Sequence, residues 1–226
     1  MEDRDSSEHL SSSLTDLMTS LMVIFILLLL VFISHTANKD TALRDTLLTE
    51  LKKDLVPQGK DRTAQGFKDS SILPDPKNPD AILVIVPNNL MGFENQESAL
   101  KKDGQQFLQT HIPALADVLC SQKIQSSIDS IVVEGHTDSH PWQGSTPEES
   151  ENKNLTLSQK RSMAVVEEAL ADLSGKTTRG CFLEKLSATG RGEQDPEKTD
   201  DESRRVIFKI HVKANDEEAV KQDVTK

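Results

Sequence analysis

Basic residues are too few in this chain to balance the acidic ones. Its 226 residues include 26 Lys and Arg against 37 Asp and Glu, and the formal net charge at pH 7 is −11. Proteins that bind nucleic acid hold the phosphate backbone mainly with clustered Lys and Arg side chains. The charge balance therefore argues against a nucleic-acid partner.

The sequence also lacks side-chain sets typical of catalysis or metal binding. No Ser–His–Asp or Cys–His arrangement stands out, so we do not expect an enzyme. His136, Asp138 and His140 alternate at the end of an expected strand and could point towards a metal ion, but no further ligand cluster accompanies them. Residues 190–192 (GRG) are too few for a phosphate loop, and we expect a turn there. We expect no metal and no bound cofactor.

Cysteine is scarce as well, since only Cys120 and Cys181 are present. In a reducing cytoplasm they would be two buried thiols, whereas in an oxidising compartment they could form one disulfide. Both alternatives stay open. The disulfide is favoured if this part of the chain lies outside the cytoplasm.

One long apolar run is present near the N-terminus. Residues 21–33 (LMVIFILLLLVFI) are apolar without a break, and segment 14–34 has the length of about 20 residues that crosses a hydrocarbon core of roughly 30 Å as a helix. A cleaved signal peptide needs a basic leader, but Arg4 is the only strong cation in residues 1–13. Nothing downstream is apolar enough to enclose this segment in a soluble core. We therefore predict a transmembrane helix over 14–34 after a leader over 1–13.

Asp16 stands near the start of this segment. A carboxylate costs on the order of 2.5–3.5 kcal/mol at the centre of a membrane helix and less near its ends, so such residues usually face a protein interface or a water-filled cavity on an ion pathway. The alternative is that Asp16 marks the helix N-terminus, where a carboxylate caps free N–H groups and favours the helix dipole.

Residues 16–22 (DLMTSLM), followed by the apolar run, closely resemble the Asp-x-Met-Thr-x-x-Met opening of the flagellar stator protein MotB. In that family the aspartate binds and releases the driving ion. The resemblance implies the same ion-translocating role for Asp16, with H⁺ or Na⁺ as the transported ion.

A linker is expected over residues 35–80. Within residues 38–55, Leu43, Leu47, Leu51 and Leu55 recur every four positions, which predicts an amphipathic helix with one apolar stripe. The stripe would be buried against a second copy or along lipid headgroups, and we favour the homodimer. The alternative is a solvated helix with incidental leucines. Residues 56–79 are rich in Pro and Gly and predict an extended tether.

Strand and helix patterns alternate over residues 81–213. Apolar or alternating runs predict strands at 81–87, 130–134 and 205–212, with a fourth at 186–189. Apolar residues at helical spacing trace two faces, one over 100–119 that Gly104 and Pro113 weaken, and one through Met163, Val166, Leu170 and Leu173. We predict an α/β domain with helices packed on one face of a mixed sheet. The mixed-charge tail 214–226 is expected to fray.

Four motifs occur in order within this domain. They are residues 133–138 (VEGHTD), 154–161 (NLTLSQKR), 190–196 (GRGEQDP) and 204–206 (RRV). Together they resemble the OmpA-like peptidoglycan-binding domain. In that family the aspartate of the GHTD motif and the arginine of the LSxxR motif hold the diaminopimelate of the peptidoglycan stem peptide.

The resemblance implies that Asp138 and Arg161 bind diaminopimelate, while Thr137, Asn154 and Leu157 shape the pocket. The free end of diaminopimelate offers an ammonium and a carboxylate side by side. An arginine can fork the carboxylate with two parallel hydrogen bonds, and an aspartate accepts from the ammonium. We place Arg161 near the start of its helix, where free N–H groups favour an anion, and expect residues 139–153 to form a long polar loop.

The cationic residues around the apolar helix conflict with this domain assignment. Arg4 stands on its N-terminal side, against Lys39, Arg44, Lys52 and Lys53 on its C-terminal side. The positive-inside rule by itself places the C-terminal side in the cytoplasm. The resemblance to a peptidoglycan-binding domain implies the opposite, with the N-terminus cytoplasmic and the domain periplasmic, and we give it precedence.

The chain as a whole resembles the B subunits of ion-driven stators, because it combines a membrane helix that begins near an aspartate with a linker and a wall-binding domain. With its acidic leader and short linker, the chain looks more like the ZorB subunits of the Zorya anti-phage system than like flagellar MotB. This resemblance implies a single-pass inner-membrane protein, a homodimer inside a ring of five multi-pass ZorA- or MotA-like subunits, and a peptidoglycan contact. The alternatives are a flagellar MotB-type stator subunit and a static membrane-to-wall tether without ion transport.

Overall fold

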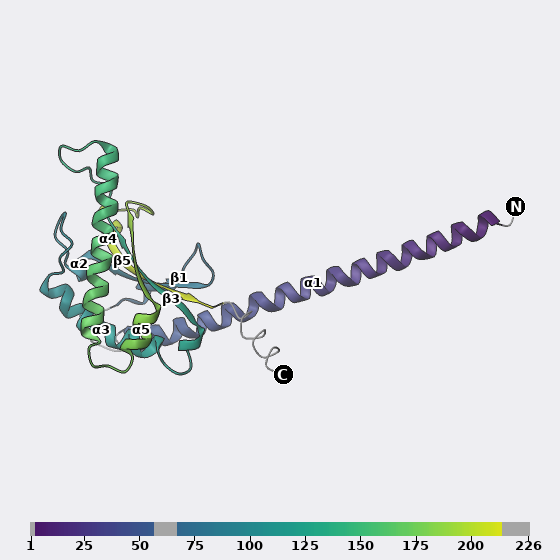
Figure 1. Cartoon of the computed structure of the whole chain (residues 1–226), viewed down its shortest axis with the longest axis horizontal. Coiled ribbons are helices and arrows are strands. Elements are labelled where there is room, and N and C mark those ends of the chain that lie inside the picture. Colours follow the sequence, from purple (N-terminus) through teal and green to yellow (C-terminus); the bar gives the residue numbers. More distant parts are fainter. Residues whose placement is uncertain (1–2, 57–66, 214–226) are drawn as a thin grey trace. The chain divides into compact units, whose positions relative to one another are not determined.

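The computed structural model describes residues 3–56 and 67–213 (Figure 1). They belong to two units, of which the first ends at Ala42 and the second spans Leu43–Ala214. Helix α1 (Asp3–Leu55) forms the described part of the first unit and contributes its C-terminal turns to the second. Residues 1–2 of the predicted leader, residues 57–66 of the predicted tether and the predicted tail 214–226 lie outside the described residues.

In the first unit, α1 contains the apolar segment expected from the sequence. Residues Asp16–Ile33 are long and apolar enough to cross a membrane, by length and composition. The large apolar side chains from Leu17 to Ile33 are exposed in the isolated chain. Because α1 begins at Asp3, Asp16 lies inside the helix, and the alternative that it caps the helix N-terminus is wrong.

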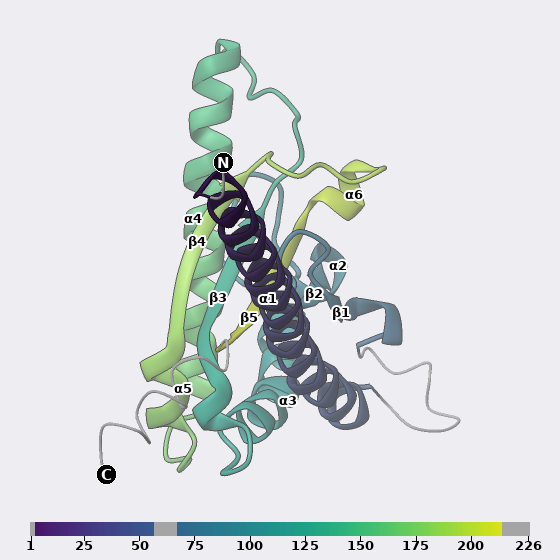
Figure 2. The ribbon, with the colours of Figure 1, turned by 90° about the vertical axis from the view of Figure 1, so that its right-hand side faces the viewer.

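The second unit is built on a five-stranded mixed sheet, as predicted (Figure 2). The strand order is β1-β2-β5-β3-β4, and only the β3–β4 pair is parallel. The strands are β1 (Ile72–Pro74), β2 (Ala81–Pro87), β3 (Ile128–His136), β4 (Leu186–Gly192) and β5 (Arg205–Val212). Strand β5 lies at the centre, with β2 on one side and β3 on the other.

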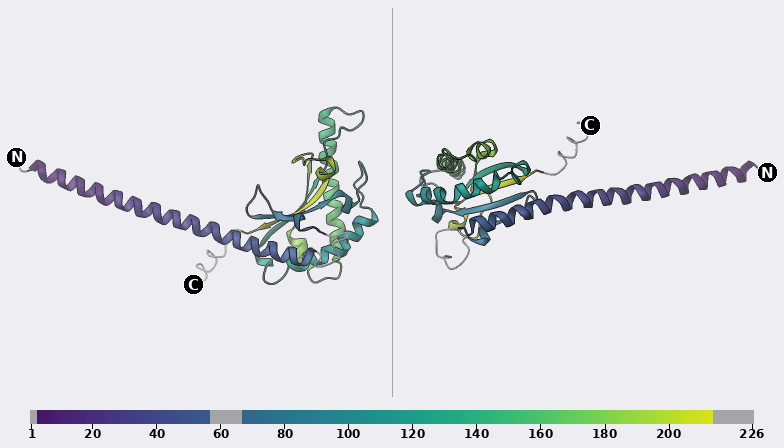
Figure 3. Two further views of the ribbon diagram at one scale, coloured as in Figure 1. Left: turned by 180° about the vertical axis from the view of Figure 1, so that it is seen from behind. Right: turned by 90° about the horizontal axis from the view of Figure 1, so that it is seen from below.

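Three helices cover one face of this sheet (Figure 3). They are α3 (Lys102–Leu119), α4 (Pro147–Asp172) and α5 (Arg179–Lys185), and two short helices, α2 (Asn88–Met91) and α6 (Asp200–Ser203), precede α3 and β5. Alternate residues of β5 enter the core beneath the helices, including the fully buried Phe208 and Ile210. The period-two pattern of the sequence matches this arrangement, because successive side chains of a strand point to opposite faces. Helix α3 continues through Pro113 without ending there.

The leucine stripe of the linker packs inside this same domain. Leu47, Leu51 and Leu55 are at most 3% exposed and belong to the core that also contains Ile72 of β1. Arg44 adds a hydrogen bond from Nη1 to the carbonyl of Pro79, 3.0 Å away. The prediction that the stripe is buried against a second copy or lipid headgroups is therefore wrong.

The domain also begins earlier than the predicted boundary at residue 81. Its compact unit starts at Leu43, and β1 pairs with β2 through Ile72 and Val84. Part of the predicted linker thus belongs to the domain and its core, which the apolar periodicity alone did not reveal.

Helix α4 is longer than its sequence pattern predicted. It begins at Pro147, after a capping box in which Thr146 and Glu149 each accept from the other's backbone N–H. Residues 147–153 of the expected loop 139–153 are therefore helical. The buried face also differs, because Met163 is 45% exposed while Val165 is fully buried. Residues 190–192 continue strand β4 and do not form the expected turn.

Cys120, which follows α3, and Cys181 in α5 form a disulfide. The bond joins segments that are 61 residues apart in the sequence and ties the end of α3 to the short helix before β4.

Candidate functional site

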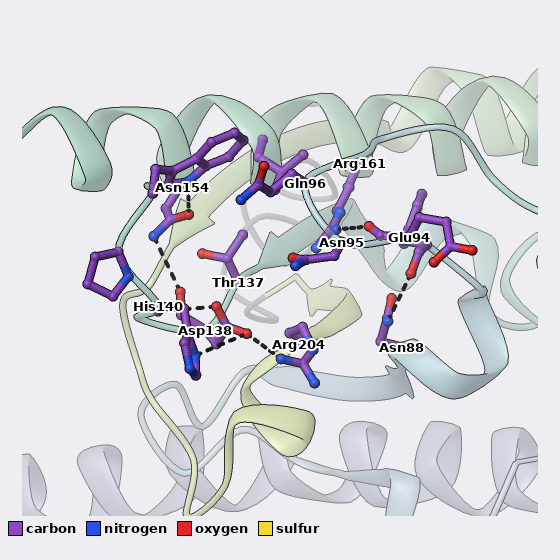
Figure 4. Close-up of a pocket in the computed structure, with 14 residues that line it drawn as sticks. Asn88, Glu94, Asn95, Gln96, Thr137, Asp138, His140, Asn154, Arg161 and Arg204 are labelled. Carbon is purple, nitrogen blue, oxygen red and sulfur yellow. Dashed lines mark hydrogen bonds and ion pairs between the residues drawn. The ribbon is translucent and has the colours of Figure 1, made fainter. Parts of the chain in front are cut away.

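One pocket of about 440 Å³ contains all five residues that the sequence motifs assigned to ligand binding (Figure 4). Thr137 and Asp138 directly follow β3, whereas Asn154, Leu157 and Arg161 belong to α4. Their spacing of three and four residues places the α4 side chains on one helix face. The residues that follow β3 form one wall of the pocket and those on α4 form another, so the motifs named residues that lie close together in the fold.

Close contact between α4 and two strands fixes the distance between these walls. A Cβ atom at Gly135 in β3 would lie 2.2 Å from the carbonyl oxygen of Ser158, and one at Gly190 in β4 would lie 2.5 Å from the backbone N of Gln159. Ser158 is fully buried and accepts a hydrogen bond from Gly192 N on its Oγ, at 2.8 Å. Only glycine leaves room for α4 at these two strand positions.

Arg161 forms the back of the pocket and is only 4% exposed. Its Nε donates to the carbonyl of Glu97 at 2.9 Å, and its Nη2 donates to the carbonyl of Glu94 at 2.8 Å. The guanidinium also lies over the ring of Phe93, 5.2 Å from its centroid. Within the described residues, no hydrogen bond engages Nη1, which leaves this nitrogen for a ligand.

Burial lowers the pKa of Arg161 to about 10, with a further lowering from Arg204 and an opposing contribution from Asp138. The guanidinium therefore stays charged at neutral pH. Arg161 lies in the interior of α4, so the expectation that it sits near the helix start is wrong. Two of its nitrogens already hold the 94–97 loop, so only its remaining N–H groups are available to a ligand.

Asp138 is paired with Arg204, a residue to which the sequence had given no role. Arg204 Nη1 contacts Asp138 Oδ2, and Arg204 Nη2 contacts Asp201. Burial tends to lower the pKa of Arg204, but the ion pairs with these two carboxylates raise it above its usual value. Asp138 is held by this arginine and by the backbone N–H of His140, 3.3 Å from Oδ1.

The loop between β3 and α4 closes the pocket through Trp142. Its indole Nε1 donates to Asn154 Oδ1 at 2.7 Å, and its backbone N donates to Ser150 Oγ at 3.0 Å. Asn154 is 3% exposed, and its amide nitrogen lies 3.4 Å from Glu193 Oε2. Asn154 therefore positions the loop and the neighbouring acid as well as lining the pocket.

Several further residues that line the pocket were not predicted from the sequence. These are Asn88, Phe93, Glu94, Asn95, Gln96, His140, Pro141, Trp142 and Arg204. Arg204 belongs to the motif at residues 204–206, on which the resemblance to the OmpA-like domain partly rests, so the sequence did contain a signal for its role in the pocket. The segment 93–96 lies between α2 and α3 and has no periodicity or motif that would place it beside α4.

The metal alternative finds no support in the geometry. His136 is 2% exposed and its Nδ1 lies 3.2 Å from the carbonyl of Gln194, whereas His140 lies beside Asp138 and Asp200. Within residues 3–56 and 67–213, no group of three or more His, Cys, Asp or Glu residues could hold a metal ion.

The chemistry of the pocket suits a zwitterionic group. A carboxylate oxygen of a ligand can accept from Arg161 Nη1 or from Arg204, and a ligand ammonium can donate to Asp138. These groups lie on different elements, so the fold sets their separation. A ligand with an ammonium and a carboxylate on one carbon matches the pairing.

Comparisons with known proteins agree with this architecture. The sequence profile of the OmpA family matches residues 92–206. A MotB-like protein from Desulfovibrio vulgaris has a similar fold, with a TM-score of 0.52 and 18% identity over 80% of this chain and 98% of that chain. The periplasmic domain of Helicobacter pylori MotB aligns with a TM-score of 0.45 and 17% identity over 68% of this chain and 96% of that chain. No curated protein matches the chain significantly in sequence.

Proposed function

The chain belongs to the OmpA family through residues 92–206, and on that premise we propose that its pocket binds the diaminopimelate of peptidoglycan. The observation that supports this most directly is the convergence of Asp138, Arg161 and Arg204 in one pocket. The ligand ammonium donates to Asp138, and its carboxylate accepts from Arg161 Nη1 and from Arg204. Charge-assisted hydrogen bonds of this kind are about twice as strong as neutral ones.

We propose that the N-terminal helix spans the bacterial inner membrane once, with the domain in the periplasm. The exposed apolar segment Asp16–Ile33 supports the span. The disulfide between Cys120 and Cys181 supports an oxidising compartment for the domain. The positions of Lys and Arg around the helix favour the opposite orientation, but peptidoglycan and stable disulfides both belong to the periplasmic side, and we give them precedence.

We propose that Asp16 carries the driving ion of a stator-type motor, with H⁺ as the ion. Asp16 lies inside α1 at the first position of the apolar segment Asp16–Ile33, and its carboxylate makes no hydrogen bond or ion pair among the described residues. A charge near the end of a membrane helix costs less than one at its centre, but such residues still usually face a protein interface or an ion pathway. Protonation removes the charge and so changes the packing that the helix prefers.

The motor requires further subunits, which we infer from the resemblance to stator proteins. Two copies of this chain would lie inside a ring of five multi-pass ZorA- or MotA-like subunits. The packing of Leu47 and Leu51 inside the domain removes the leucine stripe as support for the dimer. The acidic leader and short linker favour a ZorB-type role in anti-phage defence over a flagellar one.

Peptidoglycan binding is tested by sedimentation of the full chain, in detergent, with purified insoluble sacculi. We expect Asp138→Asn and Arg161→Ala to reduce the bound fraction strongly, while Lys176→Gln, an exposed lysine beyond the end of α4, leaves it unchanged. Asp138→Asn keeps the shape of the side chain, so loss of binding with an unchanged circular dichroism spectrum reports the site itself. Binding of both pocket variants at the wild-type level would exclude this pocket as the peptidoglycan site.

A further inference from the structure

A second pocket of about 350 Å³ adjoins the first one. The two share Gln96, Trp142 and Leu157 among their lining residues, so they border on the same side chains. A ligand that extends from the first pocket past these shared side chains would reach the second pocket.

The second pocket differs from the first in its charge. Lys153 and Lys160 line it, and no carboxylate is among its lining residues. The two lysines are seven positions apart on α4, which places them on one helix face with Leu157 between them. The first pocket, in contrast, contains the carboxylates of Asp138 and Glu94 beside its arginines.

Both lysines are available to an anion. Lys153 Nζ donates to Ser145 Oγ at 2.8 Å and lies 5.6 Å from the centroid of the Trp142 ring, which keeps its ammonium at the pocket. Neither Lys153 nor Lys160 forms an ion pair with any residue that the structure describes. Two unpaired cations over a wall formed by Trp142 and Leu157 suit a carboxylate on an otherwise uncharged chain.

We propose that this second pocket binds another carboxylate of the same peptidoglycan stem peptide, next to the diaminopimelate in the first pocket. The inference rests on the proposed function, and it assigns a second binding pocket to the part of the stem peptide that lies beside diaminopimelate. Two carboxylates of the stem meet this description: the free α-carboxylate of the γ-linked glutamate that precedes diaminopimelate, and the terminal carboxylate of the D-alanine that follows it. An extended chain advances at most about 3.3–3.6 Å per residue, so either group lies within about 10 Å of diaminopimelate.

The test measures binding of three soluble peptides to the full chain in detergent by isothermal titration calorimetry. The first peptide is L-Ala–γ-D-Glu–meso-diaminopimelate, the second has a carboxamide in place of the glutamate α-carboxylate, and the third adds a C-terminal D-alanine to the second. The proteins are the wild type, the double variant Lys153→Gln/Lys160→Gln and the control Lys176→Gln. Because exposed ion pairs contribute little each, we expect the double variant to bind its carboxylate ligand about two- to fivefold more weakly at low salt.

The pattern of losses identifies the carboxylate. If the glutamate occupies the pocket, the double variant loses affinity for the first peptide only, and the wild type discriminates between the first and second peptides. If D-alanine occupies it, the loss is confined to the third peptide. Equal affinity of the double variant and the wild type for all three peptides would overturn the inference while leaving the first pocket intact. Absence of wild-type binding to every peptide would instead overturn the proposed peptidoglycan function and this inference with it.

Discussion

Arg204 forms an ion pair with Asp138 across 66 positions of sequence. Arg204 immediately precedes β5 and Asp138 follows β3, and these two strands are neighbours in the sheet. The pair therefore joins two adjacent strand ends at the floor of the pocket. It holds the carboxylate that we assign to the ligand ammonium, so Arg204 positions Asp138 and also contributes a cation.

We expect Arg204→Gln to weaken binding of a diaminopimelate-containing peptide about tenfold. Removal of the guanidinium leaves Asp138 without its ionic partner and takes away one donor for the ligand carboxylate, a loss of about 1–2 kcal/mol. Arg204→Lys should give an intermediate affinity, because a lysine keeps the charge but cannot contact Asp138 and Asp201 together in a fork. Titration calorimetry of the full chain measures both, and equal affinities for all three proteins would contradict the role of this pair.

Gly135→Ala should destabilise the domain by about 2–4 kcal/mol. The new Cβ would lie 2.2 Å from the carbonyl oxygen of Ser158, so α4 has to move away from β3. Gly180→Ala is the matched control, because a Cβ there meets nothing within 4 Å. Differential scanning fluorimetry of the full chain should give a Tm lowered by several degrees for the first variant and an unchanged or slightly raised Tm for the second. A Tm of the Gly135 variant equal to wild type would contradict the close packing described here.

Local patterns in the sequence predicted those parts of the fold whose burial alternates regularly. The run at 81–87 became β2 with the same bounds, and the alternation at 205–212 became β5. The resemblance to the OmpA-like domain implied that Asp138 and Arg161 act together, and both line one pocket. Strand β1 escaped detection because three residues, one of them Pro74, define it only through pairing with β2.

The burial of the leucine stripe inside the domain was not predicted because periodicity identifies an apolar face but not what covers it. The leucines at 47 and 51 form a correct helical stripe, yet the stripe lies in the domain's own core. The ion pair of Arg204 was missed for another reason, because its partner is determined by the adjacency of β3 and β5 and not by any local pattern. The start of α4 could have been predicted, because Thr146 and Glu149 have the spacing of a capping box.

Loss of the disulfide should destabilise the domain by about 2–4 kcal/mol. Cys120 and Cys181 close a loop with a sequence separation of 61, and such a link reduces the conformational entropy of the unfolded chain. We expect the double variant Cys120→Ser/Cys181→Ser to unfold at lower urea concentration than the wild type, and the wild type with added reductant to match it. The same midpoint with and without reductant would show that the bond contributes nothing to stability.

At acidic pH the domain should lose the part of its free energy of unfolding that depends on the ionised carboxylate of Asp75. This carboxylate is 6% exposed and lies 2.6 Å from Lys209 Nζ. Burial tends to raise the pKa of Asp75, but the hydrogen bonds from Lys209 and from the backbone of Lys77 lower it below the usual value. Because the pKa of Asp75 is lower in the folded state, its ionised carboxylate contributes to the free energy of unfolding above about pH 4, where the carboxyl of the unfolded chain is also ionised. This stabilisation is lost as the pH falls through the pKa of the folded state.

Asp75→Asn should therefore lower the free energy of unfolding at neutral pH and flatten its dependence on pH below about 4. Asp117→Asn, which changes an exposed carboxylate on α3, serves as the control and should retain the wild-type pH profile. Urea titrations of each protein at a series of pH values measure the effect. Parallel profiles for Asp75→Asn and the wild type would contradict the assignment.

Asp16→Asn should abolish ion translocation while the assembly and its grip on peptidoglycan persist. Asparagine matches aspartate in size but cannot take up or release a proton, so the change removes the titration and little else. Asp54→Asn is the matched control, because Asp54 is an exposed carboxylate on the same helix outside the apolar segment. Proton flux is measured with a pH-sensitive dye in proteoliposomes that contain the chain with its ring partner, and sedimentation with sacculi monitors anchoring. We expect flux to vanish only in Asp16→Asn and sedimentation to stay at the wild-type level in both variants.

Phage plating and swimming of the corresponding host strains then separate a defence role from a flagellar one. Undiminished flux in Asp16→Asn would exclude this residue as the ion carrier. Absence of flux even in the wild type would favour a static tether, since a chain that only joins the membrane to the wall has no need of a carboxylate beside its apolar segment that gains and loses charge.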